Sequence, residues 1–430
     1  MNALEEAASV SNLTQVWTSK LAKLRRSCSG VDRVSAEKFE QNRAREIREI
    51  RAKLFDPDQR FKSRGLLALA KKKPDSERYR IICVPTMADR LVQFALLRTL
   101  KPNLKVMGVD NPVSFGIAEG SDRGVKGART FACSARDAHP WVYKTDIQQF
   151  FDNIQRDDLT RCLQRTIRQR SLLPLLDAFL QTEIREGFDR DWRAIVSANG
   201  IMEGRGVRQG MPLSPLFAGI YLRDFDKALI RSNIPVARYV DDIVAFFDSE
   251  AAALDFHNRV ADALATIGLQ IGPPCTPGSK TVIVPPGQPA PFLGMEVCRS
   301  PNGKHRLRVS ASCVQDCVRR LQSAGDLDYL SEKGVRLTDM GQYFRSVVNG
   351  YIHAYAEAHN CDDLKVGVEH AAKSAQAGIL RELFGRERLE RLSVQQFAFL
   401  GIDREEILSK KSRASSTEAD SIGIVSPLAG

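Results

Sequence analysis

The stretch from Ala237 to Phe247 constrains this 430-residue chain more than any other. β-Branched and aromatic residues lead up to two adjacent acids, Asp241 and Asp242, and continue beyond them. This pattern predicts a strand, a tight turn and a second strand. Two carboxylates at such a turn repel each other, and a divalent cation would remove that conflict. Because Asp favours turns in any case, the pair alone does not distinguish a metal site from a solvated turn.

The composition indicates a protein that binds nucleic acid. The formal net charge is +11, which indicates a polyanionic partner, although a merely soluble basic protein is the alternative. The nine cysteines include no CxxC pair, as expected where thiols stay reduced. No run of about 18 apolar residues could span a membrane, and no signal segment follows Met1. We therefore expect a cytoplasmic protein without a membrane segment.

A basic β-hairpin is predicted between residues 65 and 85, where two apolar runs flank a Pro/Asp/Ser turn. Lys73, Arg78 and Arg80 lie near its tip, together with two further lysines. Such a hairpin could close on a triphosphate, and an ordinary solvated turn is the alternative.

A second acid lies at the end of a predicted strand. Residues 141–147 alternate between the two faces of a strand and carry Asp146 near their end. Helices are expected over 155–185, and another helix over 214–231 follows a loop broken by glycines and prolines. If the strand of Asp146 neighbours the hairpin of Asp241 and Asp242, the three acids converge. Such a cluster can hold two Mg²⁺ ions about 3.5–4 Å apart and support phosphoryl transfer.

Several segments, taken in order, resemble the motifs of bacterial reverse transcriptases. Tyr239–Asp242 is similar to the YxDD signature, Thr145–Ile147 with Phe150–Ile154 to the first acid motif, and Arg208–Pro215 to the QGxPLSP motif. The other matching segments are Arg80–Arg90, Ser114–Gly116, Lys280 with Thr281, and Phe292–Gly294. The resemblance, to group II intron and retron enzymes, covers about residues 60–300.

The resemblance implies an α+β fold of the right-hand polymerase type, with fingers, a palm built on a small antiparallel sheet, and a helical thumb. The domains expected are an N-terminal helical extension (1–58), fingers (59–140 with part of 155–210), a palm with the YVDD hairpin (141–300), a helical thumb (301–400) and a poorly ordered tail (401–430).

The resemblance also implies catalytic roles. Asp146, Asp241 and Asp242 would be catalytic and would bind two Mg²⁺ ions, with Ile147 among the metal ligands and Mn²⁺ as an alternative ion. Lys280 would be catalytic by neutralising or protonating the departing pyrophosphate, and a solvated surface lysine is the alternative reading.

The nucleotide-binding residues follow from the same resemblance. Lys73, Arg78 and Arg80 would contact the triphosphate. Phe151 would crowd a ribose 2′-hydroxyl and so favour dNTPs, unless it only packs in the core beside Phe150. Gln209 would touch the nascent base pair. Gly210 would let the backbone approach the nucleotide closely, as only a residue without Cβ can. The full nucleotide-binding set is Lys73, Arg78, Arg80, Phe151, Gln209 and Gly210.

The expected function is that of an RNA-directed DNA polymerase that extends a 3′-hydroxyl with dNTPs. The chain looks most like the stand-alone defence-associated reverse transcriptases, which implies an associated noncoding RNA as template, a DNA primer or product, and a role in antiviral defence. Three alternatives stay open: a group II intron- or retron-type enzyme, untemplated or protein-primed synthesis, and a maturase-like RNA-binding protein. The binding alternative does not require the three acids together.

Overall fold

The computed structural model describes residues 2–22, 29–56, 61–72, 78–117, 120 and 122–400. Lys73 and the tail expected at 401–430 lie outside the described residues. The chain divides into two units. The first comprises residues 1–293 and 297–305, and the second comprises residues 294–296 and 306–430.

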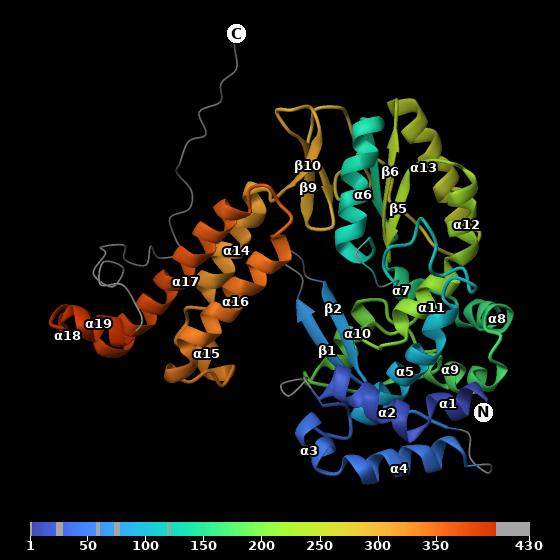
Figure 1. The fold of residues 1–430 in the computed structure, drawn as a ribbon, viewed down its shortest axis with the longest axis horizontal. Coiled ribbons are helices and arrows are strands. Elements are labelled where there is room, and N and C mark those ends of the chain that lie inside the picture. The colour runs from blue at the N-terminus through green and yellow to red at the C-terminus, as the bar shows by residue number, and fades with distance from the viewer. Residues whose placement is uncertain are drawn as a thin grey trace. The chain divides into compact units, whose positions relative to one another are not determined.

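Helices and short strands alternate along the chain, as expected for an α+β fold (Figure 1). The strands are β1 (Leu66–Lys72), β2 (Tyr79–Val84), β3 (Trp141–Asp146), β4 (Ile184–Gly187), β5 (Val236–Tyr239), β6 (Asp242–Phe247), β7 (Val282–Val284), β8 (Ala290–Phe292), β9 (Met295–Arg299) and β10 (His305–Arg308).

The α-helices of the first unit are α1 (Ala3–Ala7), α2 (Val10–Val16), α3 (Ala36–Gln41), α4 (Arg43–Leu54), α5 (Met87–Leu100), α6 (Gly124–Ala138), α7 (Phe150–Asn153), α8 (Arg156–Thr166), α9 (Leu173–Leu180), α10 (Trp192–Ala198), α11 (Ser214–Tyr221), α12 (Arg223–Arg231) and α13 (Glu250–Ala265). Those of the second unit are α14 (Ala311–Ser323), α15 (Leu327–Glu332), α16 (Met340–Tyr355), α17 (Cys361–Phe384), α18 (Arg386–Glu390) and α19 (Val394–Leu400).

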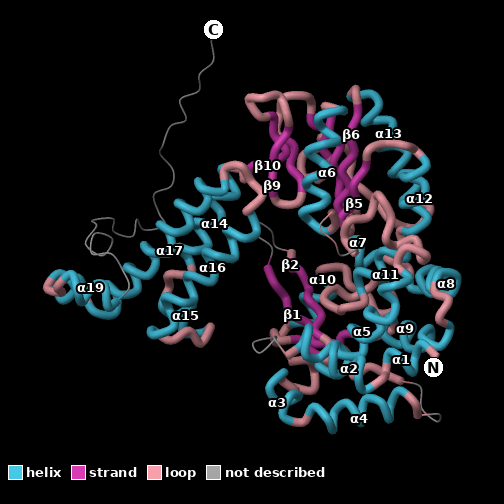
Figure 2. Tube along the Cα trace, in the orientation of Figure 1, coloured by secondary structure: helices cyan, strands magenta, loops and turns pink. Residues whose placement is uncertain are grey.

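The central sheet of the first unit has the strand order β5-β6-β3-β7. Figure 2 shows its strands β5 and β6 side by side. All of its pairings are antiparallel, and β3 lies between β6 and β7. Successive side chains of a strand point to opposite faces. The ring of Phe246 in β6 therefore packs against that of Phe131 in α6, while the ring of Phe247 packs against that of Phe256 in α13. The two helices cover opposite faces of the sheet and bury its apolar residues.

A second sheet has the order β2-β1-β4. β1 and β2 form the expected basic hairpin, with Leu67 opposite Val84 and Lys72 opposite Tyr79. β4 adds to the other edge of β1 in parallel. Helix α5 begins after this hairpin at the N-cap Thr86, whose hydroxyl accepts a hydrogen bond from the Asp89 amide. The cap fixes the helix start because it satisfies one of the otherwise unpaired amides.

Two expected helical regions differ from the prediction. The region 155–185 contains α8 and α9, but its last residues enter β4, because Ile184 pairs with Leu66 of β1. The region 214–231 forms two helices that meet at Leu222, a residue without a helical backbone conformation. Pairing with a distant strand ends the first helical region, and a change in backbone direction at Leu222 divides the second. The periodicity of the residues predicts neither boundary.

The second unit is built mainly from helices. α14 and α16 both pack against the long α17, around buried residues such as Leu321, Phe344 and Val368. No helix among the described residues has an apolar stretch long enough to cross a bilayer.

Candidate active site

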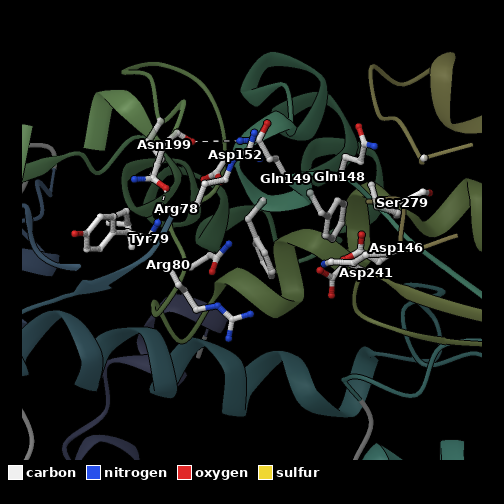
Figure 3. Close-up of a pocket in the computed structure, with 18 of the residues that line it drawn as sticks. Arg78, Tyr79, Arg80, Asp146, Gln148, Gln149, Asp152, Asn199, Asp241 and Ser279 are labelled. Atoms are coloured by element: carbon white, nitrogen blue, oxygen red, sulfur yellow. Dashed lines mark hydrogen bonds and ion pairs between the residues drawn. The ribbon is translucent and has the colours of Figure 1, made fainter. Parts of the chain in front are cut away.

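A cleft of about 450 Å³ in the first unit lies where β2, the end of β3 and α7 meet. Figure 3 shows Arg78, Tyr79 and Arg80 on one side of this cleft, and Asp146 and Asp241 on the other. The predicted site residues that line it are Arg78, Arg80, Asp146, Ile147, Phe151, Gln209, Asp241 and Lys280. Residues separated by as many as two hundred positions in the sequence thus converge.

The sheet register brings the three acids to one edge. Asp146 of β3 lies directly opposite Asp242 of β6, and Asp242 also pairs with Tyr239 of β5. Asp241 lies in the two-residue turn between β5 and β6, and its carbonyl accepts a hydrogen bond from the Ile147 amide at 3.1 Å. This bond ties the turn to the chain immediately after Asp146.

The turn is conformationally strained. Val240 has a φ of +59°, a region that β-branched residues rarely adopt. Such a conformation costs of order 1–3 kcal/mol and persists only where surrounding contacts hold it. The strain therefore lies in the residue immediately before Asp241.

The charges around the acids are unevenly balanced. Burial raises the pKa of the Asp241 carboxyl, and the neighbouring Asp242 and Asp146 carboxylates raise it further. Asp146 forms an ion pair with Lys280, and Asp242 lies 3.4 Å from the ammonium of Lys144. Asp241 is therefore the acid whose negative charge is least compensated by a cation.

The carboxylates of Asp146, Asp241 and Asp242 are suitable ligands for a divalent cation, although they do not form a closed coordination site. Within the described ranges, no three His, Cys, Asp or Glu side chains are close enough together to form a metal site. Two of the carboxylates instead contact lysine ammonium groups. Carboxylate oxygens are the ligands that Mg²⁺ prefers, and a cation beside Asp241 would relieve the repulsion that raises its pKa. Asp146, Asp241 and Asp242 are thus the residues that could hold it.

Lys280 is positioned by its neighbour in the sequence. The Thr281 hydroxyl hydrogen bonds to the Thr145 hydroxyl at 2.7 Å, and both side chains are buried. β7 follows and pairs with β3. The Lys280 side chain is 70% exposed and reaches Asp146 from this anchored position.

The loop that carries Gln209 and Gly210 is fastened to β2. The Cys83 amide donates to the Gln209 carbonyl at 2.7 Å. Gly210 has a φ of +103°, and a Cβ at this position would lie 2.5 Å from the Cys83 carbonyl oxygen. Only glycine fits here without moving the strand, so Gly210 sets how closely the loop approaches β2. Gly210 itself does not line the cleft, unlike Gln209.

A buried ion-pair cluster holds the same loop from behind. Glu183 lies 2.6 Å from a guanidinium nitrogen of Arg156 and 2.6 Å from one of Arg208. Arg156 also donates to the Gly206 carbonyl, and Arg208 to the Met202 carbonyl. Burial alone would raise the pKa of Glu183, but hydrogen bonds from Arg208 and Gly204 and the two arginine charges lower it overall.

Phe151 lies on α7 and faces the cleft. Its ring packs on that of Phe150 with centroids 5.3 Å apart, and its carbonyl accepts a hydrogen bond from the Val207 amide. Phe150 is buried, whereas Phe151 is only half-buried. The exposed part of the Phe151 ring is therefore available to a ligand in the cleft.

Sequence reasoning did not single out Asn199, which joins two walls of the cleft. Its side-chain oxygen accepts a hydrogen bond from the Tyr79 amide of β2, and its carbonyl accepts one from the Gln149 side chain before α7 (Figure 3). The Asn199-Gly200 pair indicated a loop, but no sequence signal predicts partners 120 and 50 residues away.

Comparisons with known proteins point to one family. The family model described as "Reverse transcriptase (RNA-dependent DNA polymerase)" matches residues 70–297, more than half of the chain. Group II intron-encoded protein LtrA from Lactococcus lactis subsp. cremoris, and the same protein from strain MG1363, are each 26% identical to this chain over 166 residues. These matches cover 39% of this chain and only 25% of each relative.

One solved structure is similar over much of the chain at low identity. It is telomerase from Candida albicans in complex with a fragment of telomeric RNA, with a TM-score of 0.38 and 14% identity. The likeness covers 79% of this chain and 66% of the telomerase chain.

Proposed function

This chain belongs to the reverse transcriptase family, and from that premise we propose that it is an RNA-directed DNA polymerase that extends a 3′-hydroxyl with dNTPs. The observation that carries the proposal is the convergence of Asp146 and Asp241 with Arg78, Arg80 and Gln209 in one cleft. Carboxylates for cations, guanidinium groups for phosphates and a polar side chain for a base pair are the parts that nucleotidyl transfer requires.

Asp146, Asp241 and Asp242 are the proposed Mg²⁺-binding residues, with Ile147 beside them in the chain. Two bound Mg²⁺ ions would supply a lowered pKa at the primer 3′-hydroxyl and stabilisation of charge on the transferred phosphoryl group. The chain itself supplies position: the sheet register sets Asp146 opposite Asp242, and the Ile147 amide holds the Asp241 carbonyl. Positioning and electrostatics carry most of the catalysis in phosphoryl transfer.

Arg78 and Arg80 are the proposed triphosphate contacts from the hairpin side of the cleft, and Lys73, which lies outside the described residues, is proposed as a third contact. Phe151 is proposed to exclude a ribose 2′-hydroxyl, because its half-buried ring faces the cleft. Gln209 is proposed to contact the nascent base pair, with Gly210 fixing its backbone against β2.

Lys280 is proposed to neutralise the departing pyrophosphate. Its side chain is mostly exposed and contacts Asp146. A cation that binds Asp146 would free the lysine for phosphate oxygens on the same side of the cleft.

The finer proposal concerns the template. We infer from the resemblance to stand-alone defence-associated enzymes that an associated noncoding RNA is copied, in antiviral defence. Basic helices flank the matched region: α4 carries Arg43, Arg45 and Arg48, and α14 carries Arg319 and Arg320. Phosphate contacts from such residues would supply much of the RNA affinity.

The experiment is to purify the protein from its native host, sequence the nucleic acid bound to it, and then add Mg²⁺ with each dNTP. Asp241→Ala is the matched control. We expect one defined RNA in both preparations and its DNA copy only in the wild type.

Each other outcome selects a different function. Heterogeneous RNA with copying of any primed template would favour a group II intron- or retron-type enzyme. DNA synthesis that persists after RNA removal would indicate untemplated or protein-primed addition. Tight specific RNA binding without synthesis by the wild type would refute the polymerase proposal and leave a maturase-like binding protein.

A further inference from the structure

A fully buried ion pair lies directly behind the Asp241 turn. Arg238 of β5 and Asp226 of α12 are both almost inaccessible to solvent. The arginine Nε donates to one Asp226 oxygen at 2.7 Å, and Nη2 donates to the other at 2.5 Å. The Asn111 side-chain amide donates to the same carboxylate at 2.9 Å. A buried pair of this kind is weak evidence for stability, because desolvation offsets the attraction.

One of the remaining hydrogen bonds of the Arg238 guanidinium reaches the turn that carries Asp241. Nη1 of Arg238 donates to the Val240 carbonyl at 2.8 Å, and Nη2 donates to the buried Ser114 hydroxyl at 3.0 Å. The Val240 carbonyl belongs to the peptide unit whose nitrogen is that of Asp241. The hydrogen bond therefore fixes the orientation of the peptide that leads into the acid.

This hydrogen bond acts on the one residue of the turn that is strained. Val240 has a φ of +59°, which a β-branched residue adopts only when its surroundings impose it. Asp226 aligns the arginine fork, and the fork in turn holds the Val240 carbonyl. A lysine could keep the charge but could not donate to Asp226, Ser114 and Val240 from one planar group.

A second contact of the turn comes from the segment 113–116. The segment 113–116 runs beside β5: the Arg238 amide donates to the Val113 carbonyl, and the Phe115 amide donates to the Arg238 carbonyl. Gly116 then lies against Val240, where a Cβ would be 3.0 Å from the valine Cγ2 and 3.1 Å from its nitrogen. The turn is thus held by a buried hydrogen bond and packs closely against a glycine.

We propose that Arg238, aligned by Asp226, is a positioning residue that sets the Asp241 carboxylate for cation binding. The inference rests on the proposed function, because it assigns Asp241 the role of metal ligand. Residues that orient ligating side chains typically affect metal affinity or activity 10- to 100-fold without touching the metal.

The central variant is Arg238→Lys, studied in the full-length protein. We expect hydrogen exchange in the peptide 236–247 to accelerate by on the order of tenfold, since one hydrogen bond from a charged donor is lost. Binding of Mn²⁺ without substrate, followed by the EPR signal of the free ion, should weaken on the order of tenfold or more. DNA synthesis should lose kcat by a similar factor with little change in the KM for dNTP.

Arg136→Lys is the matched control for loss of a buried arginine. Arg136 is as buried as Arg238 and donates to the carbonyls of Val297 and Gln288, away from the turn. Its substitution should accelerate exchange near residues 285–297 and leave 236–247 unchanged.

Val240→Gly separates positioning from general stability. Glycine adopts positive φ without strain, so the turn should depend less on Arg238. The fold-loss in Mn²⁺ affinity caused by Arg238→Lys should therefore be smaller in the Val240→Gly background. An equal loss in both backgrounds, following the melting temperature, would overturn the proposal.

Gly116→Ala tests the same turn if Arg238→Lys fails to fold. It leaves the ion pair intact and pushes on Val240, so exchange at 236–247 should rise and Mn²⁺ affinity should fall. Unchanged exchange and affinity in this variant would contradict the proposal. If the wild type bound Mn²⁺ but synthesised no DNA, the polymerase function would fail while the exchange and EPR results still decided the role of Arg238.

Discussion

The surroundings of Asp241 in the cleft disfavour the ionised form of its carboxyl group. Burial and the carboxylates of Asp242 and Asp146 raise the pKa of Asp241, so ionisation at neutral pH works against the fold. The strained Val240 beside it adds a further cost. Unfavourable features of this kind are commonly concentrated at functional sites. The neighbouring Asp146 and Asp242 carboxylates each contact a lysine ammonium, that of Lys280 and that of Lys144 respectively.

At this scale, Phe151 gives a direct prediction about sugar selection. Phe151→Ala should lower the preference for dNTPs over rNTPs by on the order of 10- to 100-fold, because the ring no longer crowds a 2′-hydroxyl. The measurement is the ratio of kcat/KM for a dNTP to that for the matching rNTP. Because the ratio is taken within one enzyme, any loss of folded protein cancels. An unchanged ratio would assign Phe151 to core packing with Phe150.

At the scale of elements, the position of the loop 202–213 depends on hydrogen bonds from other elements. Arg156 of α8 donates to the Gly206 carbonyl, and Glu183 before β4 accepts a hydrogen bond from the Gly204 amide. The Cys83 amide of β2 donates to the Gln209 carbonyl. Each contact comes from a different part of the chain. The position of Gln209 therefore depends on how helix α8 and the β2-β1-β4 sheet pack. A change in any of them would move Gln209.

Glu183→Gln should destabilise the protein by about 3 kcal/mol at pH 7, because two buried arginines lose their counter-charge. The pKa of Glu183 is lowered in the folded state. Its contribution is therefore fully present above the unfolded pKa of about 4.3 and is lost as pH falls through the folded value. Urea unfolding should show a wide gap between wild type and variant at pH 7 that narrows below about pH 4.

Glu203→Gln is the control for this prediction, because Glu203 is exposed in the same loop. It should unfold like the wild type at both pH values. A Glu183→Gln gap as large at about pH 3 as at pH 7 would attribute the effect to packing instead of charge.

For the whole molecule, the formal charge of +11 predicts binding to RNA through phosphate contacts. For single strands, log K should fall with log salt at a slope of about −0.7 per contact, so about six contacts give a slope near −4. Fluorescence anisotropy with a labelled single-stranded RNA, in EDTA, measures it from 50 to 200 mM salt. A slope near zero would rule out a phosphate-dominated interface.

The expected α+β fold of the right-hand polymerase type is confirmed at the same scale, together with membership of the reverse transcriptase family. The expected division into extension, fingers, palm, thumb and tail stays a prediction. The chain passes between the two compact units within residues 293–306.

The sequence by itself determined the elements whose signals are local. The Asp241 hairpin, the strand of Asp146 and the cap of α5 at Thr86 were all predictable, because alternation, turn residues and capping residues act within a few positions. The motif order also indicated residues that line the cleft, among them Asp146, Gln209 and Lys280, although Asp242 and Gly210 are not among its lining residues and the roles of all of them stay predictions. The exact ends of elements such as β4 were not predictable, since a partner strand far along the chain defines them.

Only the tertiary structure decided which side chains support the site. Arg238 and Asp226 are twelve residues apart, Asn199 and Tyr79 are 120 apart, and Lys280 and Asp146 are 134 apart. Such contacts arise from the packing of whole elements, and no residue pattern specifies their distances or directions. A motif can therefore identify the acid at the turn, whereas the buried guanidinium that holds the turn is visible only in the folded chain.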